Sequence, residues 1–325
     1  MKKMMKLTAL MLTAAMVMTG CGGSDSDDAA SSDATYKVGI VQQMEHAALD
    51  AATKGFQDKL TELLGDDVTF DYQNAQGEQT NCTTIATKFV SDGCDLIMAN
   101  ATTALQAAYA ATADIPIVGT SVTDYVTAGV VDSNEAPGRN VTGASDLAPI
   151  NEQIAMLMEL VPDAQKVGIV YCSAEPNSMY QSKLAQAELD KANIAWEEYT
   201  AADSNEVQSV VTKAVSECDV LYIPTDNTMA NNTEIIKNVA VPAGVPVIAG
   251  EEGICSGCGV ATLSISYYDL GVKAAEMAYE ILVNGADPAE MPIEYVSEGI
   301  TEKYNAEIAE ALQIAIPEGM VAIGE

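Results

Sequence analysis

The chain is poor in basic residues. Lysine and arginine together number 15, against 47 aspartates and glutamates, so the formal net charge is −32, and Arg139 is the only arginine. A surface of this kind offers no basic patch, and we therefore expect neither nucleic acid nor an anionic membrane surface as a direct partner. We interpret the acidity as a source of solubility and mutual repulsion.

The chain also contains one histidine, one tryptophan and three phenylalanines. Catalysis by a histidine-based triad would therefore have to use His46. The sequence contains no Gly-x-Ser-x-Gly elbow, no His-Glu-x-x-His helix and no phosphate-cradling glycine loop. We expect no catalytic residue, no metal and no cofactor. An α/β enzyme that uses a pair of carboxylates for acid–base work is the least favoured alternative.

The first 21 residues have the composition of an export signal. Three lysines precede an apolar run, residues 7–18, that is too short to span a bilayer. The run ends in Met18-Thr19-Gly20-Cys21, which resembles a bacterial lipobox, whose cysteine is diacylated and becomes the new N-terminus. An ordinary cleaved signal with a chance cysteine is the alternative. Residues 22–35 contain no large apolar side chain and are expected to form a flexible tether, so we predict an extracytoplasmic protein held at the membrane by lipid on Cys21.

Six cysteines follow Cys21. Cys82 and Cys94 are expected at opposite ends of one helix, roughly 18 Å apart, which is too far for a disulfide. Cys255 and Cys258 have CxxC spacing, but one such pair supplies too few ligands for a structural zinc site. We expect this pair to lie in a glycine-rich loop, either as a local disulfide or as thiols without a role.

The most informative pattern is an internal repeat. Residues 36–41 (YKVGIV) recur at 165–170 (QKVGIV), 93–97 (GCDLI) at 217–221 (ECDVL), and 115–119 (IPIVG) at 245–249 (VPVIA). The offsets of 129, 124 and 130 residues are nearly constant, and the order is kept. Three matches in register predict two copies of one architecture.

Within each copy, short apolar runs alternate with longer stretches of helical periodicity. Strands that alternate with helices form parallel sheets with helices on both faces. We therefore predict an α/β fold of two doubly wound parallel-sheet lobes. Because the signal and tether leave about 300 residues, two cores are also expected from length alone.

The lobes are expected to exchange chain segments. We predict crossings near residues 141–146, 260–266 and 292–296, and several crossings together act as a hinge. This division assigns residues 36–145 plus 262–290 to the first lobe. It assigns residues 146–261 plus 291–325 to the second lobe.

In open parallel sheets, ligands bind outside the carboxyl ends of the strands, where helix N-termini present free N–H groups. The repeat locates these ends in both lobes, and short polar residues follow them. The candidate ligand-binding residues are Gln43, His46, Thr102, Thr103, Asp124, Asn177, Ser178, Asp226, Asn227 and Glu251. We expect them to face a cleft between the lobes.

These residue types favour a small zwitterion. Because Arg139 lies outside the candidate loops, donors to a carboxylate would come from backbone N–H groups and from Thr102, Thr103, Asn177 and Ser178. An ammonium group requires a carboxylate, and Asp226 and Glu251 follow two adjacent strands of the second lobe. The alternative is structural, since Ser, Thr, Asn and Asp are common helix N-caps. His46 could equally lie on the surface.

Several segments occur in an order and spacing typical of one family. In the first copy they are Val38-Gly39-Ile40, residues 46–50 (HAALD), Gly55-Phe56, residues 74–77 (NAQG), 121–124 (SVTD), 137–143 (PGRNVTG) and Ser145-Asp146. Later in the chain they are Asn177-Ser178 and residues 222–228 (YIPTDNT), 248–251 (IAGE) and 267–271 (YYDLG). From about Tyr36 to its end, the chain resembles the ABC-transporter substrate-binding proteins whose characterised members bind tryptophan, tyrosine or phenylalanine.

This resemblance implies a periplasmic-binding-protein type I fold that closes around its solute without turnover. It implies an aromatic amino acid as the solute, with a permease and an ATPase as partners of a monomeric binding protein. The same fold binding a branched-chain amino acid or a nucleoside is the alternative. Sugar binders usually stack rings on several Trp or Phe side chains, whereas here Trp196 is expected to pack within a strand, and 13 tyrosines remain to line an aromatic pocket.

Overall fold

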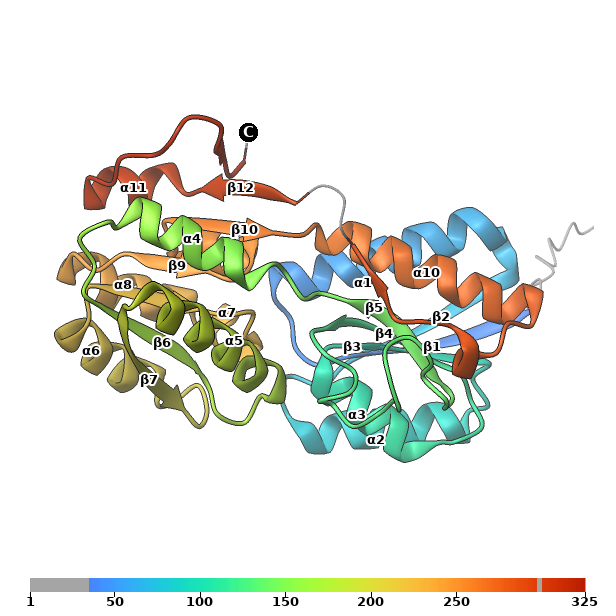
Figure 1. Cartoon of the computed structure of the whole chain (residues 1–325). Coiled ribbons are helices and arrows are strands. Elements are labelled where there is room, and N and C mark those ends of the chain that lie inside the picture. Colours follow the sequence, from blue (N-terminus) through green and yellow to red (C-terminus); the bar gives the residue numbers. More distant parts are fainter. Residues whose placement is uncertain (1–34, 297–299, 325) are drawn as a thin grey trace, which may run out of the picture. The chain divides into compact units, whose positions relative to one another are not determined.

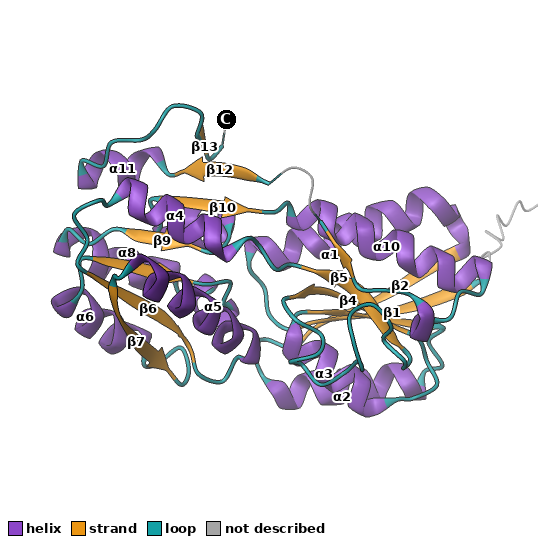
Figure 2. Cartoon of the chain, in the orientation of Figure 1, coloured by secondary structure: helices purple, strands orange, loops and turns teal. Residues whose placement is uncertain are grey.

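The structure is a computed structural model that describes residues 35–296 and 300–324. All of them belong to one compact unit, Asp33–Glu325. The predicted signal, Cys21 and nearly all of the predicted tether lie outside the described residues. The described part forms two β-sheets with helices on both faces (Figures 1 and 2). Its helices lack the combination of length and apolar character that a membrane span requires.

The first sheet is parallel, with strand order β11-β5-β4-β3-β1-β2. Its strands are β1 (Tyr36–Gln42), β2 (Val68–Asn74), β3 (Leu96–Asn100), β4 (Ile117–Val122), β5 (Val141–Ser145) and β11 (Glu294–Tyr295). One face is covered by α1 (Ala47–Leu64) and α10 (Tyr267–Asn284), the other by α2 (Gln79–Ser91) and α3 (Thr102–Ala111). Short 3₁₀ turns, η1 (Gly65–Asp67) and η2 (Pro288–Glu290), follow α1 and α10.

The second sheet has the order β13-β12-β10-β9-β8-β6-β7, and only its β10–β12 pair is antiparallel among the described pairs. Its strands are β6 (Lys166–Cys172), β7 (Ala195–Ala201), β8 (Val220–Ile223), β9 (Val247–Ala249), β10 (Ala261–Ser264), β12 (Thr301–Tyr304) and β13 (Val321–Ala322). One face packs on α4 (Ile150–Leu160), α5 (Pro176–Ala192) and α11 (Ala306–Leu312). The other face packs on α6 (Val207–Glu217), α7 (Asn227–Ala230), α8 (Thr233–Ala243) and α9 (Glu252–Cys258).

The repeat in the sequence is a repeat in topology. β2-β1-β3-β4-β5 and β7-β6-β8-β9-β10 follow the same order, and the repeated segments form β1 and β6, β3 and β8, and β4 and β9. Strands such as β3 and β4 are buried along their whole length, as expected for parallel strands covered on both faces. The predicted α/β class with two doubly wound sheets is confirmed.

Two predicted boundaries are wrong in detail. Residues 262–264 were expected in the first lobe, but they belong to β10, which pairs with β9 and β12 in the second sheet. The segment 292–296 was expected to cross, but Glu294 and Tyr295 pair with Ala144 and Ser145 in the first sheet. The third crossing therefore lies between β11 and β12. β11 pairs with β5 at the edge of the first sheet, and the next strand, β12, pairs with β10 of the second sheet.

Helix α10 follows the second sheet in sequence but packs on α1 of the first. Two glycines allow this close approach: a Cβ at Gly55 would lie 2.1 Å from the Tyr268 carbonyl oxygen, and one at Gly271 would lie 2.0 Å from the Ala52 oxygen. The Ser266 hydroxyl, as N-cap, accepts a hydrogen bond from Asp269 N at 3.2 Å. This packing returns the chain to the first sheet, as predicted.

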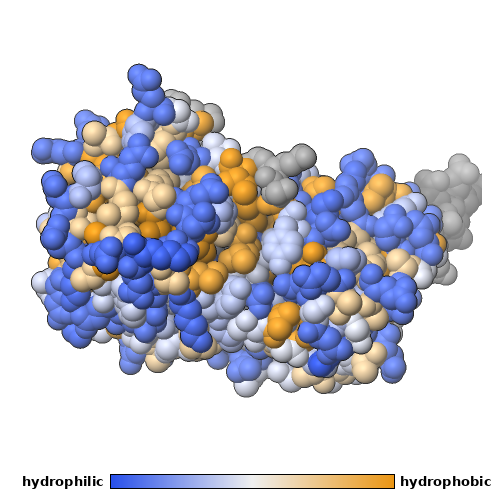
Figure 3. Space-filling view, in the orientation of Figure 1, coloured by the Kyte–Doolittle hydropathy of each residue, from blue (hydrophilic) through white to orange (hydrophobic). Residues whose placement is uncertain are grey.

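Apolar side chains form one main buried cluster on each face of each sheet. Trp196 lies in β7 and packs at the edge of one of these clusters, as expected. Hydrophilic residues cover much of the face shown in Figure 3, in keeping with the net charge of −32.

The cysteines differ from expectation in one respect. Cys255 and Cys258 lie on α9 rather than in a loop, and both are buried. The described cysteines are free thiols, so the local disulfide considered for this pair does not form. Burial raises the pKa of both thiols above the usual range, which makes them poor nucleophiles.

Candidate functional site

Strand ends from both sheets surround a small, nearly filled cavity with a free volume of about 10 Å³. Its lining consists of His46, Ala48, Leu49, Ser121, Asp146, Asn177, Thr225, Asp226, Asn227, Ala230, Glu251 and Tyr267. Most of these residues lie at or just after the carboxyl ends of strands or in the first turn of the next helix, which is the expected location of a ligand site in this type of sheet. This free volume is about enough for one water molecule, so the described arrangement is closed and has to open to admit a solute.

Half of the ten candidate residues line this cavity: His46, Asn177, Asp226, Asn227 and Glu251. Others lie close by in different surroundings. Gln43 and Thr103 line a more open cleft of about 480 Å³. Thr102 and Ser178 are buried but line neither space.

Asp124 is the candidate with the least connection to the cavity. It lines neither the cavity nor the open cleft. Its Oδ1 accepts a hydrogen bond from Thr127 N at 2.6 Å, so the carboxylate holds the turn after β4 instead.

Asp226 combines a structural contact with a position in the cavity wall. As N-cap of α7 its Oδ1 accepts from Met229 N at 2.8 Å, while Oδ2 accepts from Cys172 N at 2.6 Å. The side chain is buried, and burial, reinforced by the neighbouring charge of Glu175, raises its pKa to about 8. Asp226 is therefore a helix N-cap, as the structural alternative held, and it also lines the cavity.

Two further carboxylates line the cavity. Glu251 is the N-cap of α9 and accepts hydrogen bonds from two backbone N–H groups of its first turn, while burial raises its pKa to about 7. Asp146 follows β5; it accepts from Thr123 Oγ1 at 2.8 Å and from the Tyr267 hydroxyl at 2.9 Å. Burial also raises the pKa of Asp146.

Sequence reasoning selected the loop that contains Glu175 but not this residue. Glu175 is 3% exposed, and it accepts five hydrogen bonds: two from Asn227, two from Thr228 and one from Asn177. The signal available was an acidic residue directly before Pro176, which begins α5. Ser121, Asp146 and Tyr267 were likewise present in the family-like segments without being chosen.

His46 connects segments that belong to the two sheets. Its Nε2 lies 3.1 Å from Asn227 Oδ1, which joins the loop after β1 to the start of α7. Burial lowers the pKa of the imidazole. His46 Nδ1 and Ser121 Oγ are buried and have no hydrogen-bond partner among the described residues. Because buried polar atoms are rarely left unpaired, these two atoms are candidates for contact with a solute.

The polar lining of the cavity is acidic. Asp146, Asp226 and Glu251 contribute carboxylates, and none of the described lining residues is lysine or arginine. An opposite charge stabilises the ionised form of a buried carboxylate. The cavity is therefore suited to a cationic group such as an ammonium.

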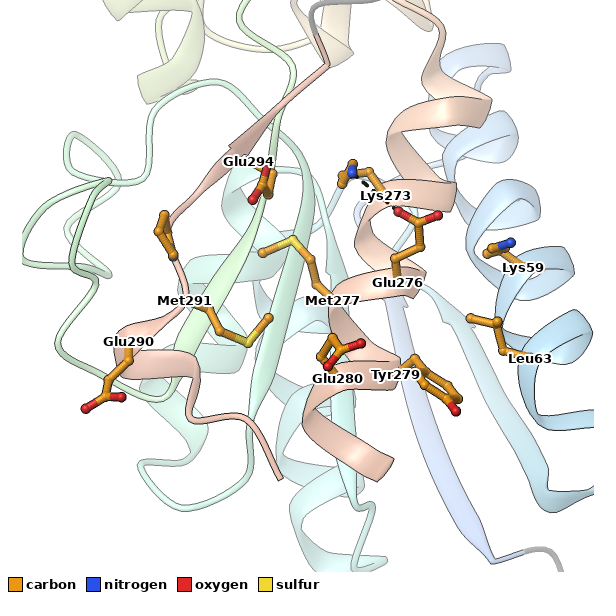
Figure 4. Close-up of a pocket in the computed structure, with 11 residues that line it drawn as sticks. Lys59, Leu63, Lys273, Glu276, Met277, Tyr279, Glu280, Glu290, Met291 and Glu294 are labelled. Carbon is orange, nitrogen blue, oxygen red and sulfur yellow. Dashed lines mark ion pairs between the residues drawn. The ribbon is translucent and has the colours of Figure 1, made fainter. Parts of the chain in front are cut away.

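A larger groove of about 560 Å³ lies on the first sheet beside α1, α10 and β11 (Figure 4). Met277 and Met291 lie near one another at its centre. Both lysines that line it are already paired, Lys59 with Glu62 and Lys273 with Glu276. The carboxyl ends of the described strands do not converge on it, so we do not consider it the solute site.

Comparison with known proteins agrees with this fold. Residues 37–324 match the sequence model of a family described as ABC transporter substrate binding protein. A curated relative, the tyrosine-binding protein of Clostridioides difficile (strain R20291), is 38% identical over 306 residues, which cover 91% of this chain and 88% of the relative.

Two solved structures are also similar. The ABC domain from Streptococcus pneumoniae in complex with L-Trp has a TM-score of 0.86 at 32% identity, with 89% of this chain and 100% of that chain covered. A ligand-free, open structure of a substrate-binding protein with adhesive properties from Clostridium difficile has a TM-score of 0.69 at 37% identity, with 89% and 99% covered. The predicted family resemblance and fold type are confirmed.

Proposed function

The chain belongs to the family of ABC transporter substrate-binding proteins, and from this premise we propose that it captures an aromatic amino acid outside the cell and delivers it to a permease with its ATPase. Proteins of this family bind solutes and are not enzymes, so no reaction is assigned to the cavity carboxylates. We place the solute among the residues of both sheets that line the small cavity, which has to widen to admit it.

The acidic lining of the cavity is the observation that carries this proposal. Three buried carboxylates, of Asp146, Asp226 and Glu251, are available to the α-ammonium group of an amino acid. The Ser121 hydroxyl lacks a partner among the described residues and can donate to the α-carboxylate. A neutral nucleoside or sugar carries no positive charge that would stabilise the ionised form of these groups.

Two relatives and one residue of the cavity lining support the proposal that the solute has an aromatic side chain. A relative at 38% identity is a tyrosine-binding protein, and a structure at 32% identity contains L-Trp. Tyr267 lines the cavity and provides a ring against which an aromatic side chain can stack.

A thermal-shift screen tests the solute class. The domain from Ser24 onward would be unfolded and refolded to remove bound solute, then mixed with the twenty amino acids, common nucleosides and simple sugars. Tyr, Trp or Phe is expected to stabilise the fold, by about 2.7 kcal/mol at 100 times its Kd. The shift should be weakened in Asp146→Asn and retained in Asp132→Asn, since Asp132 lies on the surface beside Arg139.

A response confined to a branched-chain amino acid or a nucleoside would contradict the aromatic proposal and leave the family assignment intact. A panel without any response would contradict the amino-acid proposal as a whole.

We further propose that Cys21 carries the lipid that holds this protein at the outer face of the membrane. The lipobox-like Met18-Thr19-Gly20-Cys21 supports this placement, and the family assignment supports an extracytoplasmic location. Cys21→Ala is expected to move the protein from the membrane fraction to the soluble fraction. A variant that still fractionates with membranes would contradict lipid anchoring at this residue.

A further inference from the structure

We propose that Glu175 is a positioning residue: acting through Asn227, it fixes the tautomer of His46 so that His46 Nδ1 accepts a hydrogen bond from the solute. Only the identity of the solute rests on the proposed function. The arrangement of Glu175, Asn227 and His46 is a property of the protein itself.

The first step is the orientation of the Asn227 amide. An ionised carboxylate only accepts hydrogen bonds, and five donors converge on Glu175. The group of Asn227 that faces Glu175 Oε2, at 2.7 Å, must therefore be its Nδ2. The backbone N–H of Asn227 donates to the same oxygen at 3.1 Å and holds the residue in place. The amide oxygen is consequently directed away from Glu175.

The second step is the protonation of the imidazole. Asn227 Oδ1 lies 3.1 Å from His46 Nε2. An amide oxygen cannot donate, so Nε2 must carry the hydrogen, and a neutral imidazole then has an unprotonated Nδ1. Burial is the largest influence on His46 and lowers its pKa, which favours the neutral ring against the opposing effects of Asn227, Glu175 and Asp50.

The third step is the partner of Nδ1. This atom is buried and has no hydrogen-bond partner among the described residues, and His46 lines the cavity. A lone pair in this position requires a donor, such as the ammonium or hydroxyl group of a solute. Asn227 begins α7 on the second sheet, and His46 follows β1 of the first sheet. The hydrogen bond between them therefore connects the two sides of the cavity and leaves His46 Nδ1 free to accept from the solute.

NMR spectroscopy can read this arrangement directly. His46 is the only histidine in the chain, so a long-range ¹H–¹⁵N spectrum of the labelled protein, saturated with the solute found by thermal shift, reports its tautomer without assignment. We expect a protonated Nε2 and an unprotonated Nδ1. In Glu175→Gln, the new amide can donate toward Asn227, whose own amide is then expected to reverse and present Nδ2 to the imidazole. The tautomer should change to Nδ1–H, and solute affinity should fall about tenfold or more, because a donor of the solute then meets a donor.

Glu198→Gln is the matched control. Glu198 accepts from the hydroxyl groups of Tyr171 and Ser182, away from the cavity, so this variant should keep both the tautomer and the affinity. If Glu175→Gln does not fold, Asn227→Ala provides a second reading: it removes the amide, and the single-tautomer spectrum should be lost.

An imidazole protonated at Nδ1 in the unmodified protein would overturn the proposal, and so would a tautomer that does not respond to Glu175→Gln or Asn227→Ala. If the tautomer behaves as expected with a bound solute that is not an aromatic amino acid, the positioning role stands and the proposed function is wrong. The two failures are therefore distinguishable.

Discussion

At the scale of single residues, ionisation of the buried carboxylates of the cavity lowers the stability of the solute-free fold, and the same charge favours binding of an ammonium group. Glu251 is 2% exposed, and burial raises its pKa from 4.5 to about 7. When the pKa of an acid is higher in the folded than in the unfolded chain, the free energy of unfolding falls as pH rises between the two values. Glu251 therefore stabilises the solute-free fold most below about pH 4.5, and this contribution is lost as pH rises through about 7. A bound ammonium group would offset the loss.

Glu251→Gln tests this argument, because glutamine resembles the protonated acid. Without solute, we expect the variant to match the unmodified protein near about pH 5 and to exceed its free energy of unfolding by about 3 kcal/mol near about pH 8. Urea unfolding at both pH values measures the difference. At the higher pH, affinity for an amino acid should decrease, since one counter-charge of the ammonium is removed.

The neighbouring residue supplies a control for Glu251→Gln. Glu252 pairs with Lys303 at 2.6 Å near the surface, so Glu252→Gln should change the free energy of unfolding by less than about 1 kcal/mol at either pH. A Glu251→Gln protein that is less stable at both pH values would show that the two N-cap hydrogen bonds of the carboxylate outweigh its burial.

The residues of the site were predictable to different degrees. Asp226 and Glu251 could be selected because the internal repeat locates the strand ends they follow. Glu175 could not, because its hydrogen bonds reach the start of α7, more than fifty residues later in the chain. Contacts of this range leave no periodicity in the sequence. Asp124 was selected on its position after β4, but its hydrogen bond to Thr127 N keeps it in a local turn.

At the scale of elements, the repeat predicted the paired strand order of the two sheets but not the shortest elements. β11 has two residues and β10 has four, so neither shows a pattern that specifies its partner. Helix α9 was expected to be a loop because glycine disfavours helices by about 1 kcal/mol relative to alanine. The structure shows another reason for a glycine at position 257: a Cβ there would lie 2.4 Å from Thr233 Cβ of α8. Close packing of two helices therefore overrides the local preference.

At the scale of the whole molecule, the two structural relatives differ in a way that sequence divergence does not explain. The open, ligand-free relative is more similar in sequence, at 37% against 32%, yet its TM-score is lower, 0.69 against 0.86 for the L-Trp complex. The described arrangement is therefore closer to that of a ligand-bound relative. Contacts between segments of the two sheets agree with this, since Gln181 Nε2 donates to Thr123 Oγ1 at 3.2 Å and His46 Nε2 lies beside Asn227 Oδ1.

If the chain opens and closes about its three crossings, these contacts form on closure and the solute stabilises the closed state. Small-angle X-ray scattering of the solute-free protein is then expected to give a larger radius of gyration, which falls when the amino acid identified by thermal shift is added. Gln181→Ala should weaken the closed state, so the decrease would require more solute. An amino acid without a thermal shift serves as the control and should leave the radius unchanged. A radius that does not respond to the bound solute would contradict hinge closure and favour a site that is formed before binding.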